Sequence, residues 1–218
     1  MAEALEASGT PAHVISLDNF FKGAQYYPRL PDGTLDYENP DTLDMPLIRQ
    51  CLSDLSTTGK TGLPIYDFTT ESRSSETETL DLKGGVCIVE GIHALNDECA
   101  GRNPDATCLY ISARSNVLEG EDLRFKGTWM RLTRRAVRDY NFRGTGVAET
   151  LDMWANVRRG EKLYISPFKH RANYIFDSSL PYEVSVMKNY AMPLLEAVPQ
   201  ENVRRKELLE LIDGFQGF

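Results

Sequence analysis

The stretch Val14-Ile15-Ser16-Leu17-Asp18-Asn19-Phe20-Phe21 decides the fold. Its apolar residues Val14, Ile15 and Leu17 form a run too short for a helix, so they predict a strand buried on both faces, as in parallel sheets. Asp18 closes this strand. In open α/β sheets ligands lie beyond the carboxyl ends of the strands, so an acid here points into the binding crevice. Alternatively, Asp18 is the N-cap of the next helix, because Asp is a favoured cap residue.

A second strand ends in the same way. Val86-Cys87-Ile88-Val89 predicts another buried strand, and Glu90-Gly91 closes it. Carboxylates at two strand ends indicate a site that handles a metal ion or a hydroxyl proton. The pair therefore favours a functional role for Asp18 over the helix cap.

Composition limits the class of protein. A length of 218 residues suits one domain, and a hydrophobic fraction of 41% is enough for a core. The net charge of −8 argues against general nucleic-acid binding. No apolar run approaches the roughly 18 residues of a membrane span, and no signal-peptide pattern opens the sequence. The four cysteines lack CxxC spacing, which predicts reduced thiols in a cytoplasmic protein.

Strands alternate with helices along the rest of the chain, which predicts an α/β fold with a largely parallel sheet. Pro193 is expected to kink or break its helix. The predicted helices cover residues 2–8 (ended by Gly9), about 47–55 (ended by Gly59), about 123–140, 148–157, 183–198 and 201–212. The predicted strands and extended segments cover 63–66, 77–82, 107–111 and 173–176, and residues 22–40 form an ordered loop.

The helix predicted at 123–140 is strongly basic. Four arginines follow helical spacing on one face: Arg131, Arg134, Arg135 and Arg138. From Arg124 to Arg143 the formal charge is +6, with Asp139 as the one acid. Arginine forks match phosphate oxygens, so this face predicts a small polyphosphate as ligand in preference to nucleic acid. A solvated helix face is the alternative.

Gly59-Lys60-Thr61 looks like the end of a phosphate-binding loop but is not one. The motif GxxxxGK[ST] needs a glycine where Asp54 stands, and it needs a strand before it, whereas a helix is predicted here. Gly59 is therefore interpreted as a helix C-cap. The sequence contains no other GK[ST].

Five segments in order resemble the uridine kinases of the phosphoribulokinase/uridine kinase family, across about residues 12–178. A later stretch, Arg138-Asp-Tyr-Asn-Phe-Arg143-Gly with Trp154-Ala-Asn-Val-Arg158-Arg-Gly-Glu161, is most similar to the bacterial branch in which a uridine-kinase-like domain follows a TGS-type domain. The five segments are Ile15-Ser16-Leu17-Asp18-Asn19-Phe20-Phe21, Tyr37-Glu38-Asn39-Pro40-Asp41, Pro64-Ile65-Tyr66-Asp67-Phe68 with Ser72-Arg73, Val89-Glu90-Gly91-Ile92, and Arg134-Arg135-Ala136-Val137-Arg138-Asp139 with Arg143-Gly144.

The resemblance implies a P-loop NTPase-like three-layer fold and transfer of the ATP γ-phosphate to a hydroxyl of a nucleoside or related small molecule. It implies that Asp18 is the general base, that Glu90 and Asp18 hold Mg²⁺, and that Arg138 is also catalytic. By the same match, the substrate is bound by Tyr37, Glu38, Tyr66, Phe68, Arg73 and Arg135. The ATP phosphates are bound by Arg134, Arg138 and Arg143.

The chain departs from the family in two ways. Glu71 and Met153 stand where uridine kinases carry a histidine and a glutamine, and Phe21 replaces a tyrosine, so an acceptor other than uridine is expected. The strand–GxxxxGK[ST]–helix opening is absent, so we expect an N-terminally truncated kinase, inactive in this form. Within one domain of 1–218, residues 1–9 are then the tail of the P-loop helix, 122–160 the basic lid helices and 180–218 the C-terminal helices.

Two other interpretations stay open. The chain is a non-catalytic kinase remnant that binds a nucleotide or a partner, or a structural domain whose arginine face docks an acidic surface. In the family, the absent strand lies beside the strand that ends at Glu90. Unpaired strand edges are therefore expected, and pairing with a second copy, as a homo-oligomer, is one way to cover them.

Overall fold

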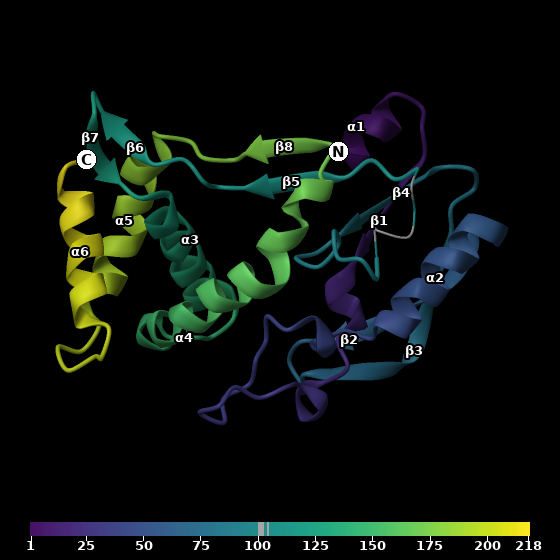
Figure 1. Cartoon of the computed structure of the whole chain (residues 1–218), viewed down its shortest axis with the longest axis horizontal. Coiled ribbons are helices and arrows are strands. Elements are labelled where there is room, and N and C mark those ends of the chain that lie inside the picture. The colour runs from purple at the N-terminus through teal and green to yellow at the C-terminus, as the bar shows by residue number, and fades with distance from the viewer. Residues whose placement is uncertain (100–102, 104) are drawn as a thin grey trace. The chain divides into compact units, whose positions relative to one another are not determined.

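The computed structural model describes residues 1–99, 103 and 105–218. These residues divide into two compact units (Figure 1), each with its own hydrophobic core. Unit 1 comprises the described residues of 1–108 together with 159–172, and unit 2 comprises 109–158 together with 173–218.

Unit 1 is built on a parallel strand pair with a helix and a hairpin. Its elements are α1 (Ala2–Ala7), β1 (Ala12–Ser16), the 3₁₀ helices η1 (Leu17–Phe20), η2 (Ala24–Tyr26) and η3 (Pro40–Thr42), α2 (Met45–Thr58), β2 (Lys60–Asp67), β3 (Ser72–Asp81), β4 (Val86–Glu90), the π-helical turn η5 (Glu161–Ile165) and the 3₁₀ helix η6 (Ser166–Arg171). The apolar face of α2 packs on Ile15 and Leu17 through Ile48, Cys51 and Leu55. This packing covers one face of the strand pair.

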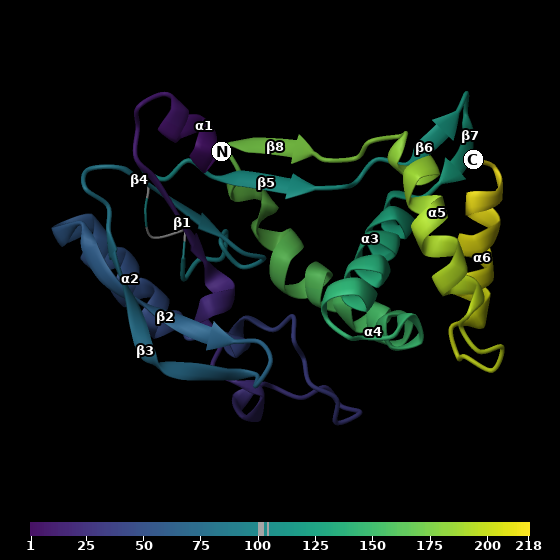
Figure 2. The same ribbon diagram turned by 180° about the vertical axis from the view of Figure 1, so that it is seen from behind.

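Unit 2 is a helical cluster with two short strand pairs. Its elements are β5 (Leu109–Ser112), β6 (Val117–Glu119), β7 (Asp122–Phe125), α3 (Gly127–Phe142), α4 (Val147–Gly160, up to the unit boundary), β8 (Tyr174–Asp177), α5 (Glu183–Glu196) and α6 (Arg205–Gln216). Figure 2 shows α3, α5 and α6 gathered at one end of this unit. Their core is filled by fully buried side chains, among them Phe125, Leu208, Leu211 and Phe215.

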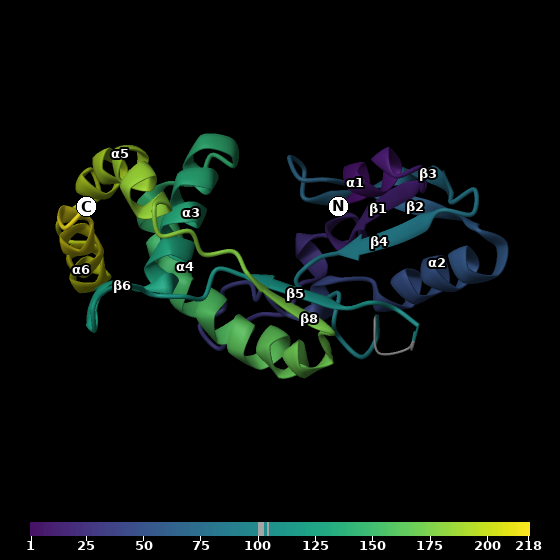
Figure 3. The ribbon, with the colours of Figure 1, turned by 90° about the horizontal axis from the view of Figure 1, so that it is seen from above.

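The sheet pairing confirms the predicted α/β class. β1 pairs with β4 and β5 pairs with β8, both parallel, while β2–β3 and β6–β7 are antiparallel hairpins. Figure 3 shows β1 and β4 side by side. Among the described strands, each of these sheets has only two members, so the parallel pairs keep the unpaired edges that were predicted.

Two predictions are wrong, one about strand burial and one about where a helix begins. Val14 is 55% exposed and Val86 42% exposed, so β1 and β4 are covered on one face and not on both. The basic helix begins at Gly127 rather than near Leu123, because residues 117–125 form the β6–β7 hairpin around Gly120, whose φ of 61° suits a tight turn.

The helix ends agree with the sequence. Gly9 and Gly59 follow α1 and α2 with φ of 86° and 75°, as the C-terminal glycines predicted. Pro193 lies inside α5 without ending it.

No described helix is long and apolar enough to cross a membrane.

Gly91 allows β4 to approach η1 closely. Its φ is 149°, and a Cβ at this position would lie 2.8 Å from the Cβ of Leu17. We expect Gly91→Ala to destabilise unit 1 by about 2–4 kcal/mol, because both the backbone conformation and the contact oppose a side chain.

Hydrogen exchange of the β1 and β4 amides measures this effect. Gly62→Ala in β2 is the control, since its Cβ would meet Thr77 at an ordinary 3.4 Å. Equal protection of β1 and β4 in both variants would contradict the close-approach argument.

Candidate functional site

The two strand-end acids lie at the same end of the β1–β4 pair, where both parallel strands have their carboxyl ends. Ser16 lies opposite Glu90 in the parallel register, and Asp18 follows Ser16 by two residues. Leu17 and Gly91, the neighbours of the two acids in the chain, are in close contact. Asp18 is half-buried within η1, and Glu90 is exposed. Ser16 is the N-cap of η1, so the alternative that Asp18 caps a helix is wrong.

This pair of carboxylates fits the predicted Mg²⁺ site. In the described residues no group of three or more His, Cys, Asp or Glu side chains gathers into a metal site. Mg²⁺ in phosphotransferases is usually held by only one or two carboxylates, with water and substrate phosphates completing the shell. Asp18 and Glu90 would supply those carboxylates.

Five rings form a continuous series, called here the aromatic chain. The ring centroids are 5.7 Å apart for Tyr37–Tyr27, 5.9 Å for Tyr27–Phe21, 5.5 Å for Phe21–Tyr66 and 5.1 Å for Tyr66–Phe68. It thus connects three residues predicted to bind substrate, Tyr37, Tyr66 and Phe68. Phe21 follows η1 directly, so the central ring of the aromatic chain lies three residues after Asp18 in the sequence.

The middle of the aromatic chain is buried and its ends are exposed. Tyr27 and Tyr66 are 9% and 7% exposed, and their hydroxyls lie 3.3 Å apart. Burial, with the hydrogen bond to Tyr66, raises the pKa of Tyr27, so this phenol keeps its proton at neutral pH. Tyr37 and Phe68 are 45% and 62% exposed, which leaves ring faces for a planar ligand.

Tyr27 was not among the predicted site residues. The signal in the sequence was the aromatic pair Tyr26-Tyr27 within the loop predicted at 22–40. Which of the two tyrosines turns inward depends on the fold, and Tyr26 is 66% exposed.

Glu38 and Tyr37 lie on a loop that is fastened by buried polar contacts. Asp36, 4% exposed, accepts hydrogen bonds from Arg159 Nη1 at 3.3 Å and from the Tyr164 hydroxyl at 3.2 Å. Asn39 Nδ2 donates to the Tyr164 hydroxyl at 3.2 Å. The last turn of α4 and η5 are therefore bound to the residues that flank Tyr37-Glu38, a contact that no local pattern predicted.

Arg73 holds together the segments that carry the candidate site. It was predicted to bind substrate, and its Nη1 donates to Asp44 Oδ2 at 2.9 Å. Its Nη2 donates to the carbonyls of Phe20 and Phe21 at 2.9 and 3.1 Å. Burial opposes ionisation of Asp44, but the hydrogen bond and charge of Arg73 hold the pKa of this carboxyl below its usual value. Arg73 thus joins β3 to the end of η1 and to the N-cap of α2.

The predicted phosphate-binding arginines lie in unit 2, and each has a partner. Arg134 donates through Nε to Glu183 Oε1 at 2.6 Å and through Nη2 to the Ser178 carbonyl at 3.1 Å. Arg131 lies over the Trp154 ring at 5.9 Å. The remaining three, Arg135, Arg138 and Arg143, surround the carboxylate of Asp139. The arginine face is therefore ordered by two acids, one of which lies far away in the sequence.

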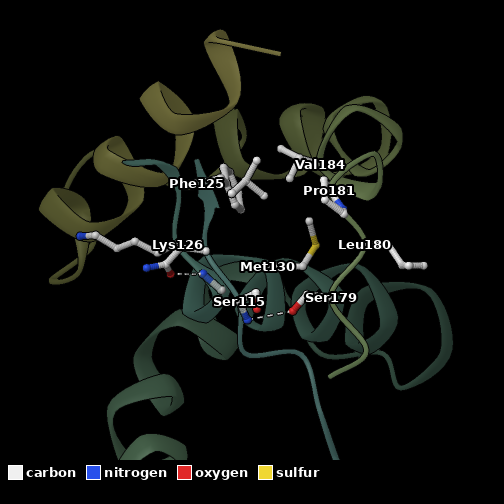
Figure 4. A pocket seen from close by; sticks show the side chains of 11 residues that line it. Ser115, Phe125, Lys126, Met130, Ser179, Leu180, Pro181 and Val184 are labelled. Atoms are coloured by element: carbon white, nitrogen blue, oxygen red, sulfur yellow. Dashed lines mark hydrogen bonds between the residues drawn. The ribbon is translucent and has the colours of Figure 1, made fainter. Parts of the chain in front are cut away.

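A small cavity of about 50 Å³ lies in unit 2 (Figure 4). Ser115 and Ser179 are hydrogen-bonded at its rim through the Ser115 amide, 3.0 Å from the Ser179 hydroxyl. Met130 and Phe125 contribute apolar surface. Its volume suits water rather than a nucleoside, and no predicted site residue lines it.

Sequence comparison identifies the family. Residues 3–185 match the Phosphoribulokinase / Uridine kinase family, and the chain belongs to it. This match runs through both units. The phosphotransferase class of the family agrees with acids at strand ends and an arginine-rich helix.

Individual relatives agree with this assignment. The chain is 30% identical to a uridine kinase of Schizosaccharomyces pombe over 143 residues, 65% of this chain and 28% of that protein. It is 27% identical to a uridine kinase of Deinococcus deserti over 168 residues, 77% of this chain and 74% of that protein. The chain thus spans about a quarter to three quarters of these relatives.

A solved structure shares the fold. The match is a protein of Silicibacter sp. TM1040 named for a fructose transport system kinase, with a TM-score of 0.57 and 20% identity, covering 80% of this chain and 79% of that one. At this identity the likeness concerns the fold alone.

We expect Arg73→Ala to destabilise unit 1 by about 2–4 kcal/mol, because it removes the charged partner of Asp44 and one donor from each of two carbonyls. The matched control is Arg49→Ala in the same unit. Its ion pair with Glu98 is more exposed, with side chains 36% and 40% accessible, so the expected loss is at most about 1 kcal/mol. Urea unfolding followed by exchange of unit 1 amides compares the two, and equal losses would refute the supporting role of Arg73.

His93 makes unit 1 sensitive to acid. The ring is 2% exposed, and neither nitrogen has a hydrogen bond of normal geometry. Burial lowers the pKa of His93 to about 4, although the nearby Glu38 backbone opposes the shift. Because the folded state resists protonation, stability is retained above the unfolded pKa near 6.5 and falls as the pH drops from 6.5 to about 4.

The expected loss over this pH range is about 3 kcal/mol. In His93→Gln the slope of stability against pH should flatten, whereas the exposed His170→Gln should keep the wild-type slope. Exchange protection of β1 and β4 between pH 7 and pH 4 is the measurement. A slope unchanged by His93→Gln would show that another group causes the acid sensitivity.

Proposed function

We propose that this protein is a phosphotransferase of the uridine kinase type, which transfers the γ-phosphate of ATP to a hydroxyl of a nucleoside-like molecule. The observation that carries the proposal is that Asp18 and Glu90 lie at the same end of the β1–β4 pair, with the central ring of the aromatic chain three residues after Asp18. A base, a metal site and a ring-stacking surface are the parts that phosphorylation of a nucleoside requires.

In the proposed reaction the acceptor hydroxyl gives its proton to the Asp18 carboxylate as its oxygen bonds to the γ-phosphorus. The bond from the γ-phosphorus to the bridging oxygen breaks, and ADP leaves. Mg²⁺ held by Glu90 and Asp18 would neutralise phosphate charge. Arg135 is assigned to the substrate side, and Arg138 and Arg143 to the ATP phosphates, where positive charge lowers the barrier. Arg134 would have to leave Glu183 to join them.

The proposed acceptor is not a pyrimidine nucleoside. Glu71 and Met153 stand in place of the base-reading pair of uridine kinases, and the charge of Glu71 contributes to the raised pKa of Tyr27, so this carboxylate lies near the aromatic chain. A site that reads a base by hydrogen bonds discriminates strongly, and replacing those groups changes the substrate. The proposed acceptor is therefore a nucleoside or related small molecule other than uridine and cytidine. The proposal includes a cytoplasmic location, which is supported by four cysteines that form no disulfide bond.

This chain by itself lacks the motif that normally binds the phosphates of a nucleotide. The 218 residues contain no GxxxxGK[ST], whose amides, lysine and following helix normally hold the β- and γ-phosphates. We therefore propose weak binding of Mg-ATP by this chain by itself, with the arginines supplying charge but no backbone cradle.

The test is transfer from ATP to a panel of nucleosides and sugars, with calorimetry of each acceptor alone. In a form of the protein that carries the P-loop, Asp18→Asn should lower kcat about 10²–10⁴-fold with little change in acceptor affinity. Asp81→Asn is the control, since Asp81 lies at the far end of β3, where it pairs with Lys60. Near wild-type turnover in Asp18→Asn would remove it from the mechanism.

Two other outcomes are informative. Acceptor binding without transfer to any acceptor, by a form of the protein that carries the P-loop, would favour the alternative, a non-catalytic binding protein of the same family. A preference for uridine would show that groups other than those at positions 71 and 153 read the base.

A further inference from the structure

Asp139 is a buried acid inside a basic cluster. It lies near the end of α3, and its side chain is 3% exposed. Its Oδ2 is 3.2 Å from Arg135 Nε, and its Oδ1 is 3.4 Å from Arg138 Nε and 3.3 Å from Arg143 Nη1. Three guanidinium groups thus converge on one carboxylate.

The main chain of Asp139 fixes the same region. Its carbonyl accepts from the amides of Arg143 at 3.0 Å and Thr145 at 3.2 Å. Between them Gly144 has a φ of 66°, which turns the chain sharply after α3. Asp139 therefore fixes the end of the helix through its carbonyl. It also fixes the backbone of Arg143, whose side chain contacts the Asp139 carboxylate.

The charges in this cluster do not cancel. One carboxylate faces three guanidinium groups, and two of these, on Arg138 and Arg143, are on side chains 51% and 53% exposed. The carboxylate itself is withdrawn from solvent. An anion arriving from outside therefore meets arginine, with Asp139 behind it. Without the carboxylate, like charges would separate these long side chains and their rotamers would be free.

We propose that Asp139 is a positioning residue for an anion site, because it holds Arg135, Arg138 and Arg143 together to receive a polyphosphate. This inference rests on the proposed function, which assigns these arginines to substrate and ATP phosphates. Arginines held in place before binding avoid the entropy cost of ordering them, so the buried acid strengthens binding of a like-charged ligand.

For a variant that lacks the Asp139 charge, the proposal predicts weaker anion binding, whereas simple electrostatics predicts tighter binding. Asp139→Asn removes a negative charge at constant size, so a field effect alone would tighten anion binding. If Asp139 positions the arginines, binding weakens, and we expect at least a fivefold higher Kd. The control is Asp213→Asn, the same charge change at an exposed residue of unit 2, which should leave the Kd equal or slightly lower.

Calorimetric titration of the 218-residue chain with inorganic tripolyphosphate at low ionic strength measures these constants. Equal or tighter binding by Asp139→Asn would overturn the positioning role while leaving the arginine site intact. If the wild-type chain binds no tripolyphosphate, the proposed arginine site itself fails, and this inference fails with it. Fluorescence of Trp129 and Trp154, both in unit 2, shows whether the variant is folded.

A second measurement applies if Asp139→Asn does not fold. The Nε–Hε signals of Arg135 and Arg138 in the wild-type NMR spectrum, assigned by Arg→Lys substitution, should be dispersed and protected from exchange. Signals averaged with those of mobile arginines would overturn the proposal.

Discussion

The parallel register of β1 with β4 is the constraint on which unit 1 depends. Because side chains alternate along a strand, a shift of one residue would exchange the buried and exposed faces of β1. In the observed register Ile15 faces α2, and Ser16 lies opposite Glu90. The acids then emerge at one edge, and Gly91 leaves room for Leu17. Arg73 completes the arrangement, since it binds the carbonyls at the end of η1.

Buried acids perform a related task in both units. Asp36 in unit 1 and Asp139 in unit 2 are almost inaccessible, and each collects polar groups from segments that would otherwise be loose. Removing a carboxylate from water is costly unless donors replace the lost hydration. The partners of Asp139 are arginines that the proposed function assigns to ligands. The donors to Asp36 are side chains of α4 and η5, which fasten the loop that carries Tyr37 and Glu38.

Local patterns predicted a large part of the fold and of the candidate site. The glycines after α1 and α2, the apolar spacing of α2 and the acids after β1 and β4 were all readable, because helix ends, amphipathic faces and strand ends depend on near neighbours in the chain. The burial of Val14 and the start of α3 were predicted wrongly. The exposure of Val14 depends on which segments pack against β1, and those lie elsewhere in the sequence. The start of α3 depends on residues 117–125 pairing as a hairpin instead of continuing the helix.

The sequence by itself determined the family, the α/β class, the positions of the acids and the concentration of arginine on one helix. Only the tertiary structure decided which partners those residues take. Arg73 bonds Asp44 across 29 positions, Arg134 bonds Glu183 across 49, and Arg159 bonds Asp36 across 123. The reason is physical: the end of a helix or strand is determined by residues a few positions away in the sequence. The partner of a long charged side chain is determined by which distant segment the fold brings next to it.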